Sequence, residues 1–308
     1  MYSDIIVYVM KDYLIKCTMC PRKCKVNRYK EKGFCFTCDK IKVAHISMHK
    51  FEEPCISNKN GSGTVFFSGC NMRCVYCQNY KISENGYGKE ITVEELANIF
   101  LKLQKMGADN INLVSPTIYA LMIKEALVIA KNEGLKIPVI YNTNGFENVE
   151  VLKQLEDVVD VYLPDFKYYF DSLSKKYSLT NNYCKVALET VKECLRQKPQ
   201  NIYDDSGKIL KGVIIRHLFL PNHLINTRNV LKTLKDNFGN DITVSIMMQY
   251  FPTYKASDFK KINRKISMRE YSKILGFLDE FNFFNGYVQE MPKNEESYVP
   301  NFDISTLK

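Results

Sequence analysis

Residues 64–80 read TVFFSGCNMRCVYCQNY, an apolar run that ends in glycine and leads directly into three cysteines. A short continuous apolar run of this kind is typical of a strand that is buried on both faces. Cys70, Cys74 and Cys77 then follow in a C-x3-C-x2-C spacing. A [4Fe–4S] cluster usually takes four thiolates, so three thiolates from one loop leave one iron free to bind a small molecule. A structural zinc ion would need a fourth ligand from elsewhere in the chain.

After this loop, short apolar runs alternate with stretches in which apolar residues recur every three or four positions. The stretch at 92–107 is typical of a helix, because Thr92 and Glu95 form a capping box and Gly107 provides a stop. The pattern predicts strands over residues 64–69, 110–115, 137–143, 160–166, 212–220, 241–249 and, at the end, 286–290. It predicts helices over residues 92–107, 120–134, 149–158, 184–197, 225–236 and 268–281.

Alternating strands and helices with apolar strands indicate an α/β protein with a parallel sheet. No G-x-G-x-x-G follows the first strand, which argues against a dinucleotide-binding fold. A complete eight-unit barrel typically takes about 250 residues. Only six strand–helix units follow the connector at 57–63. We therefore predict a partial (β/α)6 TIM-type barrel, preceded by a small cysteine-rich metal-binding module.

Polar residues occupy the carboxyl ends of the predicted strands. In a barrel of parallel strands these ends share one rim, where active sites are found. The candidate residues at this rim, besides the cysteine loop, are Ser115, Thr117, Asn142, Asn144, Asp165, Lys167, Arg216 and Gln249. Their convergence predicts an active site.

Nine of the eleven cysteines lie before residue 78. In a long chain without a secretory signal, clustered cysteines indicate metal rather than disulfides. Cys17, Cys20, Cys24 and Cys35 have a C-x2-C-x3-C-x10-C spacing, which suits either structural zinc or a second iron–sulfur cluster. We expect a cysteine-rich module over residues 1–60, the barrel over 61–290 and a C-terminal tail over 291–308.

The composition is that of a globular protein, with 45% hydrophobic and 25% charged residues among 308. No apolar run reaches the ~18 residues of a membrane span, and the first residues lack a secretory pattern. We therefore expect a cytoplasmic protein without a membrane partner. The net charge is +9, but no block of five or six like charges occurs. This distribution favours a solvated basic surface over a nucleic-acid footprint.

These motifs together resemble those of the radical S-adenosylmethionine (SAM) enzymes. The cysteine loop with Tyr76 before its last cysteine carries the resemblance, which extends from residue 17 to residue 255. Within these enzymes the chain resembles the pyruvate formate-lyase activating enzyme group, in particular its relatives with an N-terminal cysteine-rich module. The other matching stretches are EEPCIS (52–57), NINLVSPT (110–117), YNTNGF (141–146), YLPDFKY (162–168), IIRHLFLP (214–221) and QYFPTYK (249–255).

The resemblance implies an oxidoreductase that binds a [4Fe–4S] cluster through Cys70, Cys74 and Cys77 and binds SAM at the fourth iron. Reductive cleavage of SAM would give a 5′-deoxyadenosyl radical that abstracts hydrogen from a substrate. An electron donor such as flavodoxin or ferredoxin is implied as a partner. The substrate would be a glycine in a glycyl-radical enzyme or, alternatively, a peptide or small molecule. A non-enzymatic iron–sulfur or zinc protein that binds nucleic acid is the other class of function considered.

The resemblance also implies roles for single residues. Tyr76 matches the aromatic residue near the adenine, and Asn142 and Asn144 match positions beside the ribose and methionine. Asp165 and Lys167 match an Asp-x-Lys motif, and Arg216 matches an arginine of the fifth strand. Many radical SAM enzymes hold the amino group of SAM with a Gly-Gly-Glu sequence, whereas this chain has VSPTIY at 114–119. That leaves Ser115, Thr117 or a backbone carbonyl for this role.

Overall fold

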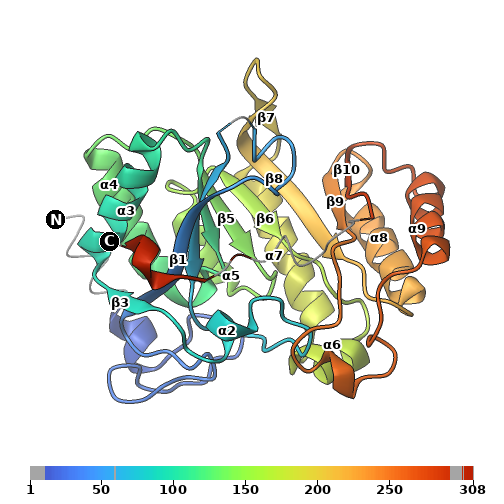
Figure 1. The fold of residues 1–308 in the computed structure, drawn as a ribbon, viewed down its shortest axis with the longest axis horizontal. Helices are drawn as coiled ribbons and strands as arrows, with labels where there is room; N and C mark the ends of the chain where they lie inside the picture. The colour runs from blue at the N-terminus through green and yellow to red at the C-terminus, as the bar shows by residue number, and fades with distance from the viewer. Residues whose placement is uncertain (1–10, 59, 292–299, 301, 308) are drawn as a thin grey trace.

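The computed structural model describes residues 11–58, 60–291, 300 and 302–307, and it shows an open sheet with helices packed on its outer face (Figure 1). The strands are β1 (Ile41–His49), β2 (Ser62–Phe67), β3 (Lys89–Ile91), β4 (Ile111–Val114), β5 (Val139–Thr143), β6 (Val161–Pro164), β7 (Ile202–Tyr203), β8 (Ile209–Leu218), β9 (Thr243–Met247) and β10 (Gly286–Val288). The helices are α2 (Tyr80–Ser83), α3 (Val93–Lys105), α4 (Ala120–Asn132), α5 (Val149–Leu152), α6 (Asp171–Ser178), α7 (Tyr183–Gln197), α8 (Leu224–Phe238) and α9 (Met268–Glu280). Short 3₁₀ turns are η1 (Thr117–Tyr119), η2 (Lys153–Leu155), η3 (Ala256–Asp258) and η5 (Ile304–Leu307).

The strand order is β10-β9-β8-β6-β5-β4-β2-β1-β3. Every neighbouring pair from β2 to β10 along this path is parallel, while β1 runs antiparallel to both β2 and β3. Among the described residues, no strand pairing joins β10 to β1 or β3, so the sheet does not close. The predicted α/β class and partial barrel are confirmed, and the short strand predicted over 286–290 is β10.

Several elements differ from the prediction. The strand β1 lies in the stretch expected to be a metal-held module, and it extends the barrel sheet instead of standing apart from it. Its sequence, IKVAHISMH, alternates over 41–43 and again over 45–49, but a register shift between Val43 and His45 interrupts the alternation, and no strand was predicted there. The predicted helix at 149–158 is α5 followed by the 3₁₀ turn η2, whereas the capping box of α3 is confirmed. The boundary at residue 60 stays a prediction, and residues 1–10 and most of 291–308 lie outside the described part.

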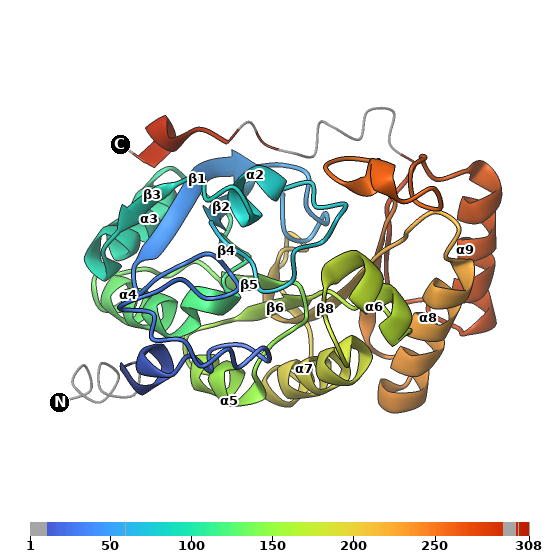
Figure 2. The same cartoon turned by 90° about the horizontal axis from the view of Figure 1, so that it is seen from below.

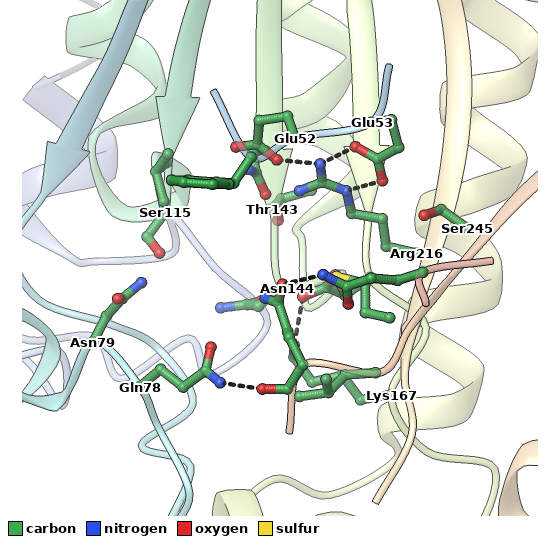
Figure 3. Close-up of a pocket in the computed structure, with 18 of the residues that line it drawn as sticks. Glu52, Glu53, Gln78, Asn79, Ser115, Thr143, Asn144, Lys167, Arg216 and Ser245 are labelled. Atoms are coloured by element: carbon green, nitrogen blue, oxygen red, sulfur yellow. Dashed lines mark hydrogen bonds and ion pairs between the residues drawn. The ribbon is translucent and has the colours of Figure 1, made fainter. Parts of the chain in front are cut away.

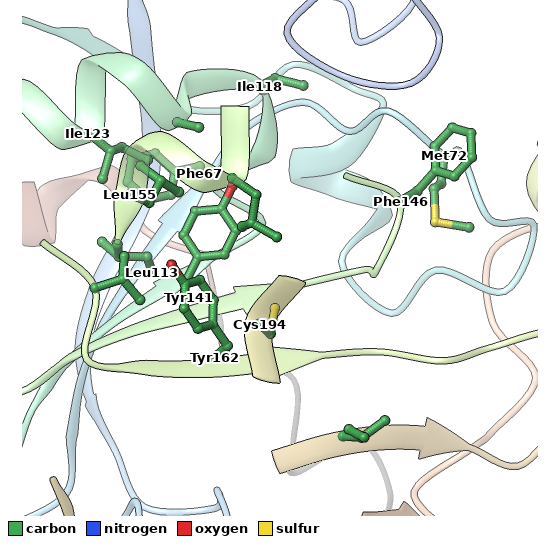
Figure 4. Close-up of a cluster of buried hydrophobic side chains, with 14 of the residues drawn as sticks. Phe67, Met72, Leu113, Ile118, Ile123, Tyr141, Phe146, Leu155, Tyr162 and Cys194 are labelled. Carbon is green, nitrogen blue, oxygen red and sulfur yellow. The ribbon is translucent and has the colours of Figure 1, made fainter. Parts of the chain in front are cut away.

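Alternation along the strands separates two apolar layers. Tyr141 of β5 and Tyr162 of β6 point outward, where they pack beneath the helices in the main core (Figure 4). Ile140 and Leu163, one position away on the same strands, point inward and pack against Cys55 and other residues of a second, smaller cluster. This inner cluster fills the amino-terminal part of the barrel. The carboxyl-terminal part of the interior therefore remains for polar side chains.

The helices cover the outer face in pairs, with α3 against α4, α5 against α7 and α8 against α9. Figures 1 and 2 show that the N-terminal loops and the short helices α2 and α6 lie at the same end of the sheet, the end at which β2, β4 and β5 terminate. The turn η5, close to the C-terminus, packs against β1. In the part of the chain that the structure describes, no helix is long and apolar enough to cross a membrane.

Gly145 makes a turn after β5 that brings two parts of the rim together. Its φ is +76°, and a Cβ at this position would lie 1.9 Å from the carbonyl oxygen of Asp165. We expect Gly145→Ala to lower the free energy of unfolding by more than the ~1–2 kcal/mol of a left-handed residue, because the Asp165 backbone must also move. Gly207→Ala is the matched control, since its φ is +80° and no atom lies within 4 Å. Equal losses in urea unfolding would contradict this explanation.

Candidate active site

A cavity of about 570 Å³ occupies the barrel interior at the carboxyl ends of the strands. This volume is in the range of sites that enclose a small-molecule ligand. The predicted residues that line it are Cys70, Cys74, Tyr76, Cys77, Ser115, Asn142, Asn144, Asp165, Lys167, Arg216 and Gln249. Side chains that the sequence reading did not single out also line it, among them Glu52, Glu53, Gln78, Asn79 and Ser245 (Figure 3). The structure thus brings together nearly all of the predicted rim residues.

Thr117 is the predicted residue that does not reach the cavity. It is buried in the turn η1, and its hydroxyl donates a 2.6 Å hydrogen bond to Glu147. Ser115, two positions earlier, lines the cavity with a φ of +60°, a region that residues other than glycine rarely adopt. Backbone strain of this kind concentrates at functional sites. Of the two hydroxyls considered for the amino group of SAM, only that of Ser115 lies at the cavity.

The three thiols at one end of the cavity each have a polar hydrogen directed at the sulfur or a hydroxyl beside it. The Ser178 hydroxyl donates to Cys74 Sγ at 2.9 Å, and the Ser83 hydroxyl lies 3.4 Å from Cys77 Sγ. The Asn144 side-chain amide donates to Cys70 Sγ at 3.6 Å. Hydrogen bonds to the sulfurs are a recurrent feature of iron–sulfur sites, where they tune the potential.

Burial raises the pKa of the Cys74 thiol to about 11 and that of Cys77 to about 12. Thiols in such surroundings ionise when a metal takes the place of the proton. Within the described ranges, no three Cys, His, Asp or Glu side chains converge on a single ion position. Three thiols from one loop at the end of a cavity are a donor set that fits a [4Fe–4S] cluster with one iron left for a ligand.

Contacts with distant segments hold the cysteine loop in place. The Val75 amide donates to the carbonyl of Tyr177 in α6 at 2.8 Å, and the Val75 carbonyl accepts from the Lys255 amide at 2.9 Å. The Gln78 side chain donates to the carbonyl of Gln249 at 2.9 Å (Figure 3). These bonds explain why the stretch 249–255, far along the chain, belongs to the site.

Asp165 and Lys167 form an ion pair at the end of β6, with 13% of each side chain exposed. Burial lowers the pKa of Lys167, but the charge of Asp165 outweighs it, so the pKa lies above its ordinary value. Lys167 therefore stays charged beside the thiols. The pair presents a cation and an anion to a ligand that carries both signs, as SAM does.

Arg216 lines the cavity, but two carboxylates already hold it. Its Nε donates to Glu53 Oε1 at 2.9 Å, and its Nη2 donates to both Glu52 and Glu53 (Figure 3). Burial would raise the pKa of Glu53, but the Arg216 guanidinium outweighs it and holds this pKa below its ordinary value. The stretch EEPCIS at 52–57 contains these two glutamates, but the sequence pattern did not predict that they pair with Arg216. The geometry makes Arg216 first of all the anchor of the segment before Cys55.

Tyr76 presents its ring to the cavity from between two cysteines. Its hydroxyl hydrogen-bonds to that of Tyr168, and its ring packs edge-on against Tyr250 with 5.9 Å between centroids. Burial raises the pKa of Tyr76 well above the ordinary value, so the phenol stays neutral. The ring is therefore fixed in position before any ligand binds.

Residues 64–203 match the family model described as the Radical SAM superfamily. The chain is also 34% identical to the uncharacterized protein MJ0674 of Methanocaldococcus jannaschii, over 91% of this chain and 79% of that protein. The chain belongs to the radical SAM superfamily. It is 23% identical to the pyruvate formate-lyase-activating enzyme of Clostridium pasteurianum, over 72% of this chain and 89% of that enzyme.

Among solved structures, the chain is similar to the FeFe-hydrogenase maturase HydG from Carboxydothermus hydrogenoformans, with 18% identity and a TM-score of 0.49. That match covers 76% of this chain and 55% of HydG, so the chain spans about half the length of that structure. Membership of the superfamily makes the chain a radical SAM enzyme, which implies a [4Fe–4S] cluster and SAM as its cofactors. The donor set at residues 70–77 fits that cluster.

Glu147 is a buried carboxyl just outside the cavity wall, and sequence reasoning did not identify it. It accepts hydrogen bonds from the hydroxyls of Thr117, Thr143 and Tyr141, which tie together the turns after β4 and β5. Burial raises the pKa of Glu147 to about 7, although these hydrogen bonds act in the opposite direction. The folded state therefore holds this proton more tightly than the unfolded state does.

This raised pKa predicts a pH dependence of stability. The contribution of Glu147 is complete below pH 4.5, its ordinary pKa, and is lost as the pH rises to about 7. We expect Glu147→Gln to gain about 3 kcal/mol relative to wild type between pH 4.5 and pH 8. Urea unfolding at several pH values measures this difference, with the exposed Glu189→Gln as control. A constant difference between Glu147→Gln and wild type would contradict the assignment.

Removal of the Arg216 guanidinium should destabilise the folded protein, whatever its effect on the reaction. We expect Arg216→Ala to lower the free energy of unfolding by about 3–5 kcal/mol, because Glu53 would be left buried without a partner. The double variant Arg216→Met with Glu53→Gln removes the guanidinium and the more deeply buried of its two carboxylate partners, so it should recover most of that loss. Unfolding in urea checks both variants. A destabilisation that the double variant does not reduce would show that Arg216 acts through packing instead.

Proposed function

We propose that this enzyme is a glycyl-radical activase, which takes hydrogen from a glycine in the loop of a partner protein. The observation that carries the radical SAM part is the cavity itself, in which three thiols of one loop face polar side chains from the strand ends. The similarity to the pyruvate formate-lyase-activating enzyme of Clostridium pasteurianum supports the activase part. The chemistry that the bound cluster and SAM supply is one-electron cleavage of the sulfonium, which gives a radical that abstracts hydrogen.

In this proposal Cys70, Cys74 and Cys77 bind the cluster. Ser178 and Asn144 orient two of these sulfurs through the hydrogen bonds that they donate. The carbonyl of Gln249 fixes the end of the loop through Gln78. Because the loop is held before any cofactor binds, little of the binding free energy is needed to order it.

The residues beside the thiols would bind SAM. Lys167 is charged and suits the carboxylate of SAM, while Asp165 suits its ammonium or sulfonium group. Asn142 and Asn144 present amides along the same wall, and the ring of Tyr76 offers a flat apolar surface for the adenine. Ser115 is the side chain that we assign to the amino group in place of Gly-Gly-Glu.

The far end of the cavity favours a second candidate substrate class. Glu52, Glu53 and Arg216 close this end, and Tyr287 also lines the cavity. An enclosed polar end suits a small molecule or a short peptide that inserts a side chain, as well as a glycine loop. The alternative proposal is therefore radical modification of a peptide or small molecule at the same site.

The first test counts iron and acid-labile sulfide after anaerobic purification. We expect Cys74→Ser to lose about four irons with matching sulfide and to produce no 5′-deoxyadenosine from SAM with dithionite. Cys184→Ser on α7, a half-buried cysteine outside the cavity, should behave as wild type. If Cys74→Ser keeps its full iron content, the cluster assignment is wrong.

The second part of the same test separates the two substrate classes. The wild-type enzyme is incubated with SAM, dithionite and a glycyl-radical enzyme from the source organism, and the mixture is examined by electron paramagnetic resonance. A stable glycyl radical on the partner, absent with Cys74→Ser, is the expected result. 5′-Deoxyadenosine formation that no such partner increases would favour the peptide or small-molecule class.

A further inference from the structure

Cys17, Cys20, Cys24 and Cys35 line a second, small cavity next to the cysteine loop. Asn71, the neighbour of Cys70, lines the same cavity. The sulfurs of Cys24 and Cys35 lie 3.5 and 3.4 Å from the position that a Cβ would take on Gly33. Four thiols around one small cavity are the ligand number of a [4Fe–4S] cluster or of structural zinc.

Arg28 shows that this region requires negative charge. Its side chain is fully buried and donates to the carbonyls of Cys38 and Ile118 and to the Thr37 hydroxyl. Among the described residues, none of the ion pairs includes Arg28. A buried cation is normally matched by an anion. Four thiolates around a metal group would supply that charge, because Arg28 lines the same small cavity as the four cysteines.

Arg22 connects the two groups of cysteines. Its guanidinium donates to the carbonyls of Asn71 and Met72 in the loop and, at 2.8 Å, to that of Leu179. The same side chain lines the small cavity together with Cys17, Cys20, Cys24 and Cys35. The arginine therefore lies between both groups.

Two further contacts place the segment around Cys35 directly against the loop that holds Cys70, Cys74 and Cys77. Arg22 and Arg73 lie 3.4 and 3.9 Å from the ring centroid of Phe34, the neighbour of Cys35. A Cβ on Gly69, the residue before Cys70, would lie 2.7 Å from the carbonyl oxygen of Cys35. Phe34, Arg22 and the backbone of Cys35 and Gly69 therefore lie at the boundary of the two sites.

The outer side of this second site is basic. Cys24 is exposed, and the exposed Lys23 and Lys25 flank it. Residues 11–40 hold nine Lys and Arg against three Asp and Glu, a net +6 of the +9 carried by the whole chain. Such a surface attracts an acidic protein and speeds its association.

We propose that Cys17, Cys20, Cys24 and Cys35 bind a second iron–sulfur cluster, through which an acidic, low-potential one-electron carrier protein reduces the first. One electron leaves the carrier, reduces the second cluster and passes to the cluster at Cys70, Cys74 and Cys77, and no proton or group moves with it. The position of the four thiols next to the first cysteine loop, with Asn71 of that loop lining the same cavity, favours a redox-active cluster over structural zinc. This inference rests on the proposed function, because it requires that Cys70, Cys74 and Cys77 bind the first cluster.

Metal content tests the second cluster without any measurement of activity. We expect about eight irons in the wild type and about four in Cys24→Ala. Because the Cys24 side chain is exposed, its truncation should not cause misfolding, so a loss of iron would report on the ligand itself. Cys38→Ala, in the same segment but outside the cavity, should keep all the iron. The remaining cluster of Cys24→Ala should still change its electron paramagnetic resonance signal when SAM is added.

The two proposals fail in different ways. One zinc in the wild type that Cys24→Ala loses, or metal content that Cys24→Ala leaves unchanged, would overturn the second cluster and leave the first intact. Iron that Cys74→Ser fails to lose would overturn the first cluster. Zinc and iron are measured in the same preparations, so one set of samples decides both.

The path of the electron is tested by the rate at which the first cluster is reduced. With photoreduced flavodoxin at low ionic strength, we expect Cys24→Ala and the double variant Lys23→Glu with Lys25→Glu to be at least 10-fold slower than wild type. Lys185→Glu with Lys192→Glu, exposed on α7, is the matched charge control. Dithionite, a small reductant, should reduce the lysine variants at the wild-type rate. Equal rates with flavodoxin in all variants would overturn the electron path.

Discussion

Side chains alternate between the two faces of a strand, and the whole site depends on this constraint. Tyr141 and Tyr162 pack under the helices, so Asn142 and Leu163 must point inward. Position along the strand then divides the interior, with apolar side chains near the amino ends and polar ones near the carboxyl ends. A shift of one residue in any strand would exchange its core and cavity side chains. The register that buries the outer core therefore also assembles the cavity.

This constraint also explains how much of the molecule the sequence could predict. The parallel strands were visible as apolar runs, and the polar residues at their ends, such as Asn142 and Asp165, lie together because parallel strands share a rim. Thr117 follows the same strand as Ser115, but a left-handed turn at Ser115 sends the chain away from the cavity. The backbone conformation of a single residue leaves no periodic pattern in the sequence. The sequence therefore could not predict that Ser115 lines the cavity and Thr117 does not.

Contacts between distant segments were equally hidden. Glu53 and Arg216 are 163 positions apart, and neither lies in a pattern that names the other. The strand β1 was missed because a register shift between Val43 and His45 interrupts the alternation of its sequence. Both omissions concern the segment that leads from the cysteine-rich stretch into the barrel. Packing against a remote element, rather than local preference, decides the structure there.

Buried or half-buried cations lie at three places between the N-terminal cysteines and the far end of the cavity. Two of them have carboxylate partners: Lys167 pairs with Asp165, and Arg216 pairs with Glu52 and Glu53. At the third, Arg22 and Arg28 have carbonyls as acceptors and thiols as neighbours.

The same electrostatic requirement applies at all three places, because a buried charge without a counter-charge is costly. In the proposed second cluster, thiolate sulfur would supply the negative charge that carboxylates supply at the other two places. Arg22 donates to the carbonyl of Met72, and the amide of Met72 donates to Cys70 Sγ at 3.4 Å. Arg22, which lines the small cavity of the N-terminal cysteines, therefore also contacts the backbone residue whose amide donates to Cys70.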